Sequence, residues 1–359
     1  MTMTTMMSGS SAVLSSSLLL IVCVALHGHG HLSASAFLTG GAPPTSSSDA
    51  STIMAQITSL SSVKEFFNKP GPYGVKHYSD ANSAVIEPVS ADIQKPFPTV
   101  VMSKGNGALC GTSVINAYNS ILTHLATHGV ASVTPCSVTY VNPAGLKSTI
   151  KRITTSGFAN PEKIGVAAHS LGGNSALGLF PDELNIKALA LLSGVTCILN
   201  IPHCNPSGVN VPFFMVQPSL DQNSDVYGPA KSAKLYAPFA GEHNAAIYNN
   251  IPKGYLAAFF SLFLDALPSN ETVIREMTAE LLFGDDPASF KNDFLGARIA
   301  FPDASAVVSE ASPDVSVFSI DNDDDDANST NLVLAARAYL AANPGSEGDS
   351  KPSSFLFAG

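Results

Sequence analysis

Short apolar runs alternate with longer amphipathic segments through the middle of this chain. Apolar runs rich in β-branched residues are typical of strands that are buried on both faces. Such runs lie at Pro98–Met102, Val130–Val133, Ile164–Ala168, Ile186–Leu192 and Val211–Val216, and a shorter strand with a glycine turn is expected at Ala237–Glu242. Apolar residues recur at helical spacing over Ser113–His128, Leu146–Thr154, Val226–Tyr236 and Tyr255–Leu264.

Strands that alternate with helices predict an α/β domain, in which helices cover both faces of a mostly parallel sheet. The expected domain spans residues 63–301. Roughly 240 residues are enough for one domain with a sizeable core. In open parallel sheets, sites lie at the carboxyl ends of the strands. Polar residues that directly follow a predicted strand are therefore the first candidates for chemistry.

The first part of the chain has the character of a targeting sequence. The first 63 residues contain no Lys or Arg, and Asp49 is their only acidic residue. The apolar run Ala12–Leu26 has the length of a signal-peptide core and is too short for a membrane-spanning helix. The small residues Ala34, Ser35 and Ala36 form a cleavage site. We therefore expect a signal peptide over residues 1–36.

The segment of residues 37–62 is rich in Ser and Thr and poor in acidic residues, as transit peptides are. The join from Ala34 to Phe37 resembles the cleavage motif of two-part plastid presequences in algae with complex plastids. That resemblance implies delivery to the plastid, and secretion is the alternative. Transit peptides are usually basic, and this segment has no basic residue.

The chain beyond the expected domain, residues 302–359, is acidic. It contains the run Asp321–Asp326, followed by an apolar stretch with helical character at Leu332–Leu340. Runs of this kind are usually solvated and disordered, so we expect a largely disordered tail with one short helix. The run lacks the spaced ligands, central Gly and distal Glu of an EF-hand calcium loop.

Charge and cysteine spacing exclude two further classes of function. The formal net charge of −10 argues against nucleic-acid binding. Cysteines 110, 136, 197 and 204 show no metal-binding spacing, so no metal or other cofactor is expected. In an oxidising compartment we expect Cys197 and Cys204 to close a small disulfide, and in a plastid stroma buried free thiols are at least as well expected.

The segment Gly165–Gly173 carries the clearest chemical signal. An apolar strand runs into His169-Ser170-Leu171-Gly172-Gly173, and a helix of small residues follows. This pattern is typical of a nucleophile elbow, in which a serine occupies a strained turn between a strand and a helix. Ala168 stands at the first small position, and His169 is expected to be a spacer that packs or hydrogen-bonds near the elbow. Ser170 is the candidate nucleophile, and an ordinary strand-to-helix turn is the alternative.

A serine nucleophile needs an imidazole base and an acid that holds the base, in the chain order Ser, acid, His. The histidines that follow Ser170 are His203 and His243. His243 follows the short predicted strand and is the candidate base, with His203 as the alternative. Asp221, which follows the predicted strand Val211–Val216, is the candidate acid. Asp225 is its alternative, with a helix cap as its ordinary role, and Glu242 ranks third.

Acyl transfer also needs two backbone N–H donors for the developing oxyanion. One is expected from Leu171, the residue after the nucleophile. The other is expected from the loop Ser103–Gly107 after the first predicted strand, with Asn106 as the candidate and Gly107 second. A phosphate-binding loop is the competing interpretation, but the glycine spacing fits neither a P-loop nor a dinucleotide fingerprint.

With these residues in place, the chain resembles the α/β-hydrolases of the dienelactone-hydrolase, chlorophyllase and polyester-hydrolase (cutinase-like) group. Three further stretches carry the resemblance: Gly71-Pro72-Tyr73, Leu122–Val130 and Glu162–Val166. It covers roughly residues 71–267 and implies an α/β-hydrolase fold. It assigns the nucleophile to Ser170, the acid to Asp221, the base to His243, and the oxyanion donors to Asn106 and Leu171.

The chain departs from this group around the site. Lys104 stands where the group often has His or Pro, Leu171 stands where plant chlorophyllases carry Arg, and the chain contains no Trp. These differences concern the substrate more than the chemistry. The resemblance therefore implies a serine carboxyl-ester hydrolase. The expected substrate is chlorophyll, from which a chlorophyllase-like enzyme releases phytol. An acyl lipid such as a galactolipid is the alternative substrate.

The implied partners are an apolar ester and a thylakoid-type membrane, contacted peripherally for access to that ester. The same residues would support acyl transfer to an alcohol other than water. A non-catalytic interaction protein built on the hydrolase fold is the hypothesis from a different class.

Overall fold

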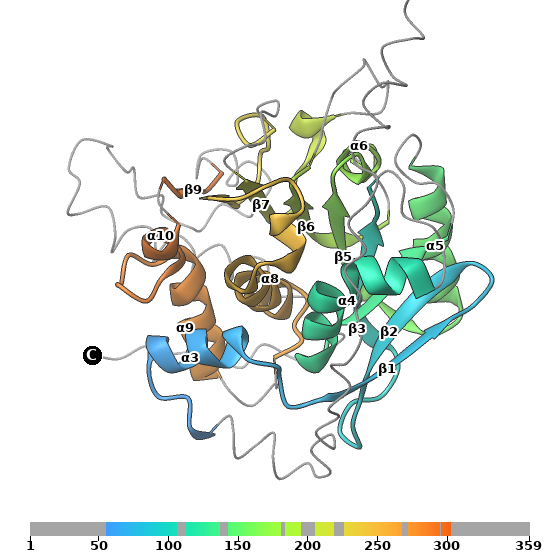
Figure 1. Ribbon diagram of the computed structural model, residues 1–359, viewed down its shortest axis with the longest axis horizontal. Coiled ribbons are helices and arrows are strands. Elements are labelled where there is room, and N and C mark those ends of the chain that lie inside the picture. The colour runs from blue at the N-terminus through green and yellow to red at the C-terminus, as the bar shows by residue number, and fades with distance from the viewer. Residues whose placement is uncertain are drawn as a thin grey trace, which may run out of the picture. The chain divides into compact units, whose positions relative to one another are not determined.

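The computed structural model describes residues 55–105, 112–136, 143–180, 184–194, 205–218, 226–267, 272–294 and 296–302, with side chains described from residue 118 onward in the second range. The expected signal peptide, most of the transit-type segment and the acidic tail lie outside these residues. The described residues form one nine-stranded sheet with helices on both faces (Figure 1). The predicted α/β class with a mostly parallel sheet is therefore confirmed.

The strands follow the spatial order β1-β2-β4-β3-β5-β6-β7-β8-β9. Strands β3 to β8 are parallel to one another, and β1, β2 and β9 add antiparallel pairs at the two edges. Their bounds are β1 (Gly74–Ser79), β2 (Ser83–Val89), β3 (Phe97–Ser103), β4 (Ala131–Pro135), β5 (Ala159–His169), β6 (Ile186–Leu192), β7 (Phe213–Pro218), β8 (Lys234–Phe239) and β9 (Arg298–Ala300).

The helices are α3 (Leu60–Asn68), α4 (Thr112–Thr127), α5 (Ala144–Thr155), α6 (Gly172–Leu177), α7 (Ala245–Tyr248), α8 (Asn250–Phe263), α9 (Thr272–Phe283) and α10 (Phe290–Asp293), with a 3-10 turn at Pro206–Gly208. Helices α4 and α8 contact one face of the sheet, and α3 and α9 pack on α8. Helices α5 and α6 cover the other face (Figure 1). Alternate residues of one strand enter the two cores, as the pleat requires: Val100 and Met102 join one, and Val101 joins the other.

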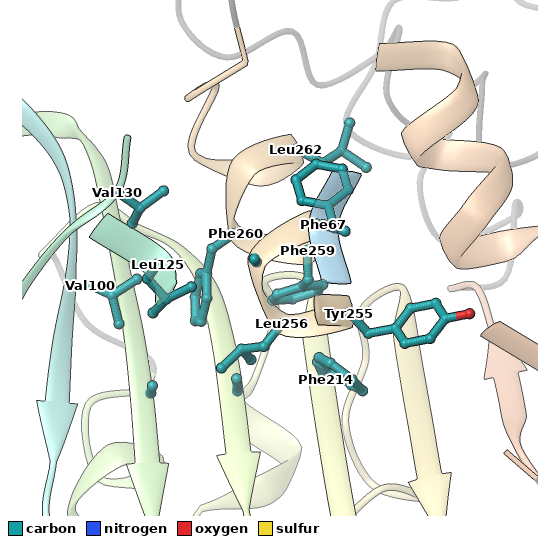
Figure 2. Close-up of a cluster of buried hydrophobic side chains, with 14 of the residues drawn as sticks. Phe67, Val100, Leu125, Val130, Phe214, Tyr255, Leu256, Phe259, Phe260 and Leu262 are labelled. Carbon is teal, nitrogen blue, oxygen red and sulfur yellow. The ribbon is translucent and has the colours of Figure 1, made fainter. Parts of the chain in front are cut away.

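Helix α8 is the centre of the larger core. Leu256, Phe259 and Phe260 project from it among the strands, the neighbouring helix α4 and Phe67 of α3 (Figure 2). The Phe260 ring lies over β5 at Gly165, where an added Cβ would be 2.8 Å from the ring. The absence of a side chain at Gly165 thus lets α8 approach the strand that leads to the candidate nucleophile.

Most predicted elements are confirmed, but the helix predicted at Val226–Tyr236 is wrong. Tyr227–Pro229 is a turn, and β8 begins at Lys234, earlier than the strand expected at Ala237–Glu242. The Lys234 ammonium donates to the carbonyls of Tyr227, Gly228 and Ala230, each at 2.9 Å. These carbonyls are satisfied without helical bonds, and Pro229 has no N–H to donate.

Helix α3 crosses the domain boundary expected between residues 62 and 63. Ser59 and Ser62 form a capping box that starts the helix, and Ile57 already belongs to the core. The end of α3 is fixed by two buried histidines, one in the last turn of α4 and one directly after that helix. His124 Nε2 donates to the Phe67 carbonyl at 2.7 Å, and His128 Nε2 donates to the Lys69 carbonyl at 3.1 Å.

The stretches Gly71-Pro72-Tyr73 and Leu122–Val130 meet in space. The N–H groups of Gly71 and Tyr73 donate to the side chain and the carbonyl of Thr127, respectively. Gly129 ends the helix with a left-handed backbone (φ 89°), as its position in the sequence predicts. Both stretches therefore have a structural role in ending α4 and leading the chain into β1 and β4.

Replacement of Gly165 by Ala tests the approach of α8 to β5. The new methyl group has to displace the Phe260 ring, so we expect Gly165→Ala to lower the free energy of unfolding by about 1–3 kcal/mol. Urea denaturation measures the change. In the double variant with Phe260→Leu the loss should be smaller than the sum of the single losses. Strict additivity would show that the contact does not limit the packing.

The buried histidines predict acid sensitivity. Burial holds the pKa of His128 at about 3 and that of His124 at about 4. Between these values and about 6.5, the unfolded chain binds protons that the folded protein does not. The free energy of unfolding should therefore fall as the pH falls, by up to about 1.4 kcal/mol per pH unit for each histidine.

Urea denaturation at several values between pH 7.5 and pH 4.5 measures this dependence. His128→Gln keeps a side-chain N–H donor but does not titrate, so its stability should depend less steeply on pH. His77→Gln, on the exposed edge strand β1, is the matched control and should change the slope less. An unchanged slope in His128→Gln would contradict the prediction.

Candidate active site

Ser170 occupies a strained turn between β5 and α6. It has a left-handed backbone (φ 53°), while β5 ends at His169 and α6 begins at Gly172. A residue with a Cβ pays about 1–2 kcal/mol in this conformation, so the surroundings have to impose it. The strand, the turn and the helix follow one another as the sequence predicts. The Ser170 side chain is only half-buried, so it remains accessible at the carboxyl edge of the sheet.

Close backbone contacts hold this turn. The Ser170 N–H donates to the Leu192 carbonyl at 3.2 Å, and the Ser170 carbonyl accepts from the Gly173 N–H at 3.0 Å. A Cβ on Gly172 would lie 2.4 Å from the Ser103 carbonyl oxygen, and a Cβ on Gly105 would lie 2.8 Å from the Ser170 Cβ. Gly105, at the start of the loop after β3, therefore lies directly against the candidate nucleophile.

His243 lies in the segment between β8 and α7 and is half-buried. Its carbonyl accepts a 2.5 Å hydrogen bond from the Ser193 hydroxyl, and its ring lies 5.1 Å from the His169 ring, centroid to centroid. Ser193 directly follows β6 and is fully buried, also with a left-handed backbone (φ 49°). Neighbouring residues at the end of β6 thus hold both Ser170 and the His243 segment.

His169 is a buried, neutral residue at the centre of these contacts. Burial, together with the neighbouring His243, lowers its pKa to about 3. Its Nδ1 lies 3.2 Å from the Tyr118 hydroxyl, which also accepts the Gly105 N–H at 3.0 Å. The prediction that His169 packs and hydrogen-bonds beside the elbow agrees with this geometry.

Of the other predicted site residues, Leu171 is among the described residues, and Asp221 and Asn106 are not. Leu171 is the half-buried N-cap of α6, and its carbonyl accepts from the Asn174 N–H. The candidate acid Asp221 and the candidate donor Asn106 lie outside the described residues. The alternatives Gly107, His203 and Asp225 also lie outside them, whereas Glu242 is described and exposed. The structure therefore brings the Ser170 and His243 segments together. The acid and both oxyanion donors stay predictions.

The contacts of Ser193 and Tyr118 at this edge were not predicted from the sequence. Ser193 follows a confirmed strand at the carboxyl edge, and that position was the available signal. Tyr118 gave no signal, because it falls on the apolar side of a helix and its hydroxyl meets Gly105 only in the folded chain.

The end of β4 carries a covalent and a polar contact next to the loop after β3. Cys136 is disulfide-bonded, whereas the only pair considered from the sequence was Cys197 and Cys204. The buried Lys104 ammonium donates to the Cys136 carbonyl at 3.1 Å. Burial lowers the pKa of this lysine. Cys197 and Cys204 lie outside the described residues.

Two exposed apolar side chains follow the candidate base along the chain. Tyr248 ends α7 with 56% of its surface exposed, and Ile251, in the first turn of α8, is 47% exposed. Tyr248 also lies close enough to Tyr118 to contribute to the raised pKa of that buried phenol, whose main cause is burial. Exposed apolar side chains are thus present in the segment that follows the candidate base.

The described part of the chain contains no group of three metal-ligating side chains. Nor does it contain a helix with the length and apolar character to cross a bilayer. Comparisons with protein-family models and with curated proteins find no match to this chain. The arrangement itself places a half-buried hydroxyl on a strained turn and holds the His243 segment against the end of β6, whose Leu192 carbonyl also accepts the Ser170 N–H.

The left-handed backbone of Ser170 predicts that Gly makes the protein more stable than Ala does at this position, the reverse of their usual order. Both variants remove the hydroxyl, but only Gly adopts this backbone without steric cost. We expect Ser170→Gly to be more stable than Ser170→Ala by about 1–2 kcal/mol in urea denaturation. At Ser156, where φ is −76°, the Ala variant should be at least as stable as the Gly variant. Ala above Gly at both positions would show that the turn is not strained.

Proposed function

We propose that this protein is a serine carboxyl-ester hydrolase with an α/β-hydrolase fold. The observation that carries the proposal is the left-handed Ser170 at the β5–α6 turn, with the loop after β3 packed against it. A strained serine between a strand and a helix, at the carboxyl edge of a parallel sheet, is the arrangement of a nucleophile elbow. The position of His243 after β8 agrees with the order Ser, acid, His.

In the proposed reaction, the Ser170 hydroxyl attacks the ester carbonyl carbon while His243 accepts the hydroxyl proton. The tetrahedral oxyanion is stabilised by the backbone N–H groups of Leu171 and Asn106. Collapse of this intermediate breaks the ester C–O bond, and His243 returns the proton to the departing alcohol. Water, activated by His243, then releases the acid from the acyl-enzyme. Asp221 holds the imidazole in the required tautomer throughout.

The proposed substrate is an apolar plastid ester, and chlorophyll is the specific candidate, giving chlorophyllide and phytol. The apolar surface at Tyr248 and Ile251 beside the base segment supports an apolar ester. The plastid assignment rests on the resemblance of the Ala34–Phe37 join to plastid presequences, with secretion as the alternative. Access to such an ester would involve peripheral contact with a thylakoid membrane. A galactolipid or another acyl lipid is the alternative substrate.

Active-site labelling tests the chemistry separately from the substrate. A fluorophosphonate probe should modify the wild-type protein at Ser170, because phosphonylation needs an activated serine. Peptide mapping locates the modified residue. Ser170→Ala should not be labelled, whereas Ser156→Ala, at the end of α5, should be labelled like the wild type. Absence of label in the wild type would contradict the proposal and favour a non-catalytic interaction protein.

Substrate assays on the same three proteins decide the ester. We expect the wild type and Ser156→Ala to release chlorophyllide from chlorophyll a in detergent and to cleave a short nitrophenyl ester. Ser170→Ala should do neither, with a loss of at least about 10³-fold. Cleavage of the nitrophenyl ester and a galactolipid, but not chlorophyll, would keep the serine chemistry and overturn the chlorophyll assignment.

A further inference from the structure

A buried series of polar contacts connects three segments of the candidate site. The Gly105 N–H, in the loop after β3, donates to the Tyr118 hydroxyl of α4 at 3.0 Å. The same hydroxyl lies 3.2 Å from Nδ1 of His169, at the end of β5. Tyr118 is 3% exposed and His169 is 5% exposed, so water contributes little to these bonds. We call Tyr118 and His169 the Tyr–His pair.

The positions of the protons in these contacts follow from the donors present. The Tyr118 oxygen accepts the Gly105 N–H, and among the described residues the acceptor within reach of its own proton is Nδ1 of His169. Nδ1 therefore accepts, and the proton of the neutral imidazole is placed on Nε2. The hydroxyl thus selects the tautomer of His169 while it holds the loop at Gly105.

His169 links these contacts to the base segment, which carries His243. Its ring packs against the His243 ring at 5.1 Å, and the His243 backbone acts on the ring as a hydrogen-bond acceptor that opposes the fall of its pKa. Nε2 of His169 makes no well-formed hydrogen bond among the described residues. The N–H placed on Nε2 can therefore interact with the His243 backbone only through a long bond. Such bonds are often long without substrate and tighten in the reacting complex.

We propose that the Tyr–His pair positions two parts of the reaction machinery, the loop after β3 and the His243 segment, relative to Ser170. This inference rests on the proposed function, because it assigns these segments to oxyanion binding and to the base. Tyr118 and His169 are positioning residues, since they act through Gly105 and His243. Ser193 completes the arrangement by holding the His243 carbonyl from β6.

A purely structural role would be served as well by two apolar rings. The described chain contains a matched example of an ordinary buried tyrosine, Tyr255 of α8, whose hydroxyl donates to Asp293 at 2.6 Å. That bond joins α8 to α10, and neither element carries a candidate catalytic residue. Loss of the Tyr255 hydroxyl should lower stability without any effect on catalysis. The two tyrosines therefore separate a positioning role from a folding role.

The kinetic experiment compares Tyr118→Phe with Tyr255→Phe in the full chain. Each change removes one oxygen and keeps the ring. With a nitrophenyl ester, Tyr118→Phe should lower kcat about ten- to hundredfold, since small misplacements of catalytic groups have effects of this size. Its KM should stay within about twofold of the wild-type value, because the pair does not touch the ester. Tyr255→Phe should keep the wild-type kcat.

Labelling with 15N-histidine gives a readout that does not depend on activity. In the wild type, the His169 ring should show a protonated Nε2 and an unprotonated Nδ1 across pH 5 to 8, with His169→Gln identifying its signals. In Tyr118→Phe the ring should lose this fixed tautomer and show a mixture. The same spectra should be unchanged in Tyr255→Phe.

Each outcome has a distinct meaning. A wild type that neither labels nor hydrolyses esters contradicts the proposed function itself. An active wild type together with a Tyr118→Phe variant of unchanged kcat contradicts the positioning role alone. A His169 ring protonated on Nδ1 in the wild type, or an equal loss of kcat in both Tyr→Phe variants, also overturns it.

Discussion

The turn after β5 packs directly against the end of β3, and the carboxyl edge of the sheet is arranged around that contact. Parallel pairing places Ser103 beside Ala168 and His169 beside Leu192, so the chain leaves three adjacent strands at one level. Gly105 and Gly172 then allow backbone to meet backbone where a methyl group would not fit. The strain at Ser170 is retained because the register of three strands holds its neighbours on both sides.

Much of this arrangement was accessible from the sequence, because apolar runs and small residues are local signals. The strands around β3 to β7 and the turn at Ser170 followed from them. The helix predicted at Val226–Tyr236 failed because the side chain of Lys234 satisfies three carbonyls that a helix would otherwise pair. The link from Tyr118 to Gly105 could not be predicted, since it joins residues that have no common periodicity. The positions of Asp221 and Asn106 remain predictions from chain order and from the resemblance.

Burial divides the described histidines into two groups with different chemistry. His124, His128 and His169 are enclosed by apolar surroundings that keep the pKa of each far below its ordinary value, so they remain neutral donors and acceptors. His243 lies half-buried at the carboxyl edge, and His77 is exposed on the edge strand β1. A sequence motif does not make this distinction, because all five are the same residue type. The fold makes it by deciding which imidazoles are enclosed.

The capping box at Ser59 and the burial of Ile57 set a limit on how this protein can be matured. Any peptidase that trims the chain from its beginning has to cut upstream of Ile57, because a cut within α3 would remove core side chains and expose the apolar faces of α8 and α9. A terminus produced by such trimming would therefore be constrained by the packing of Ile57 and α3. Exposed apolar surface on an over-trimmed product would mark it for aggregation or degradation.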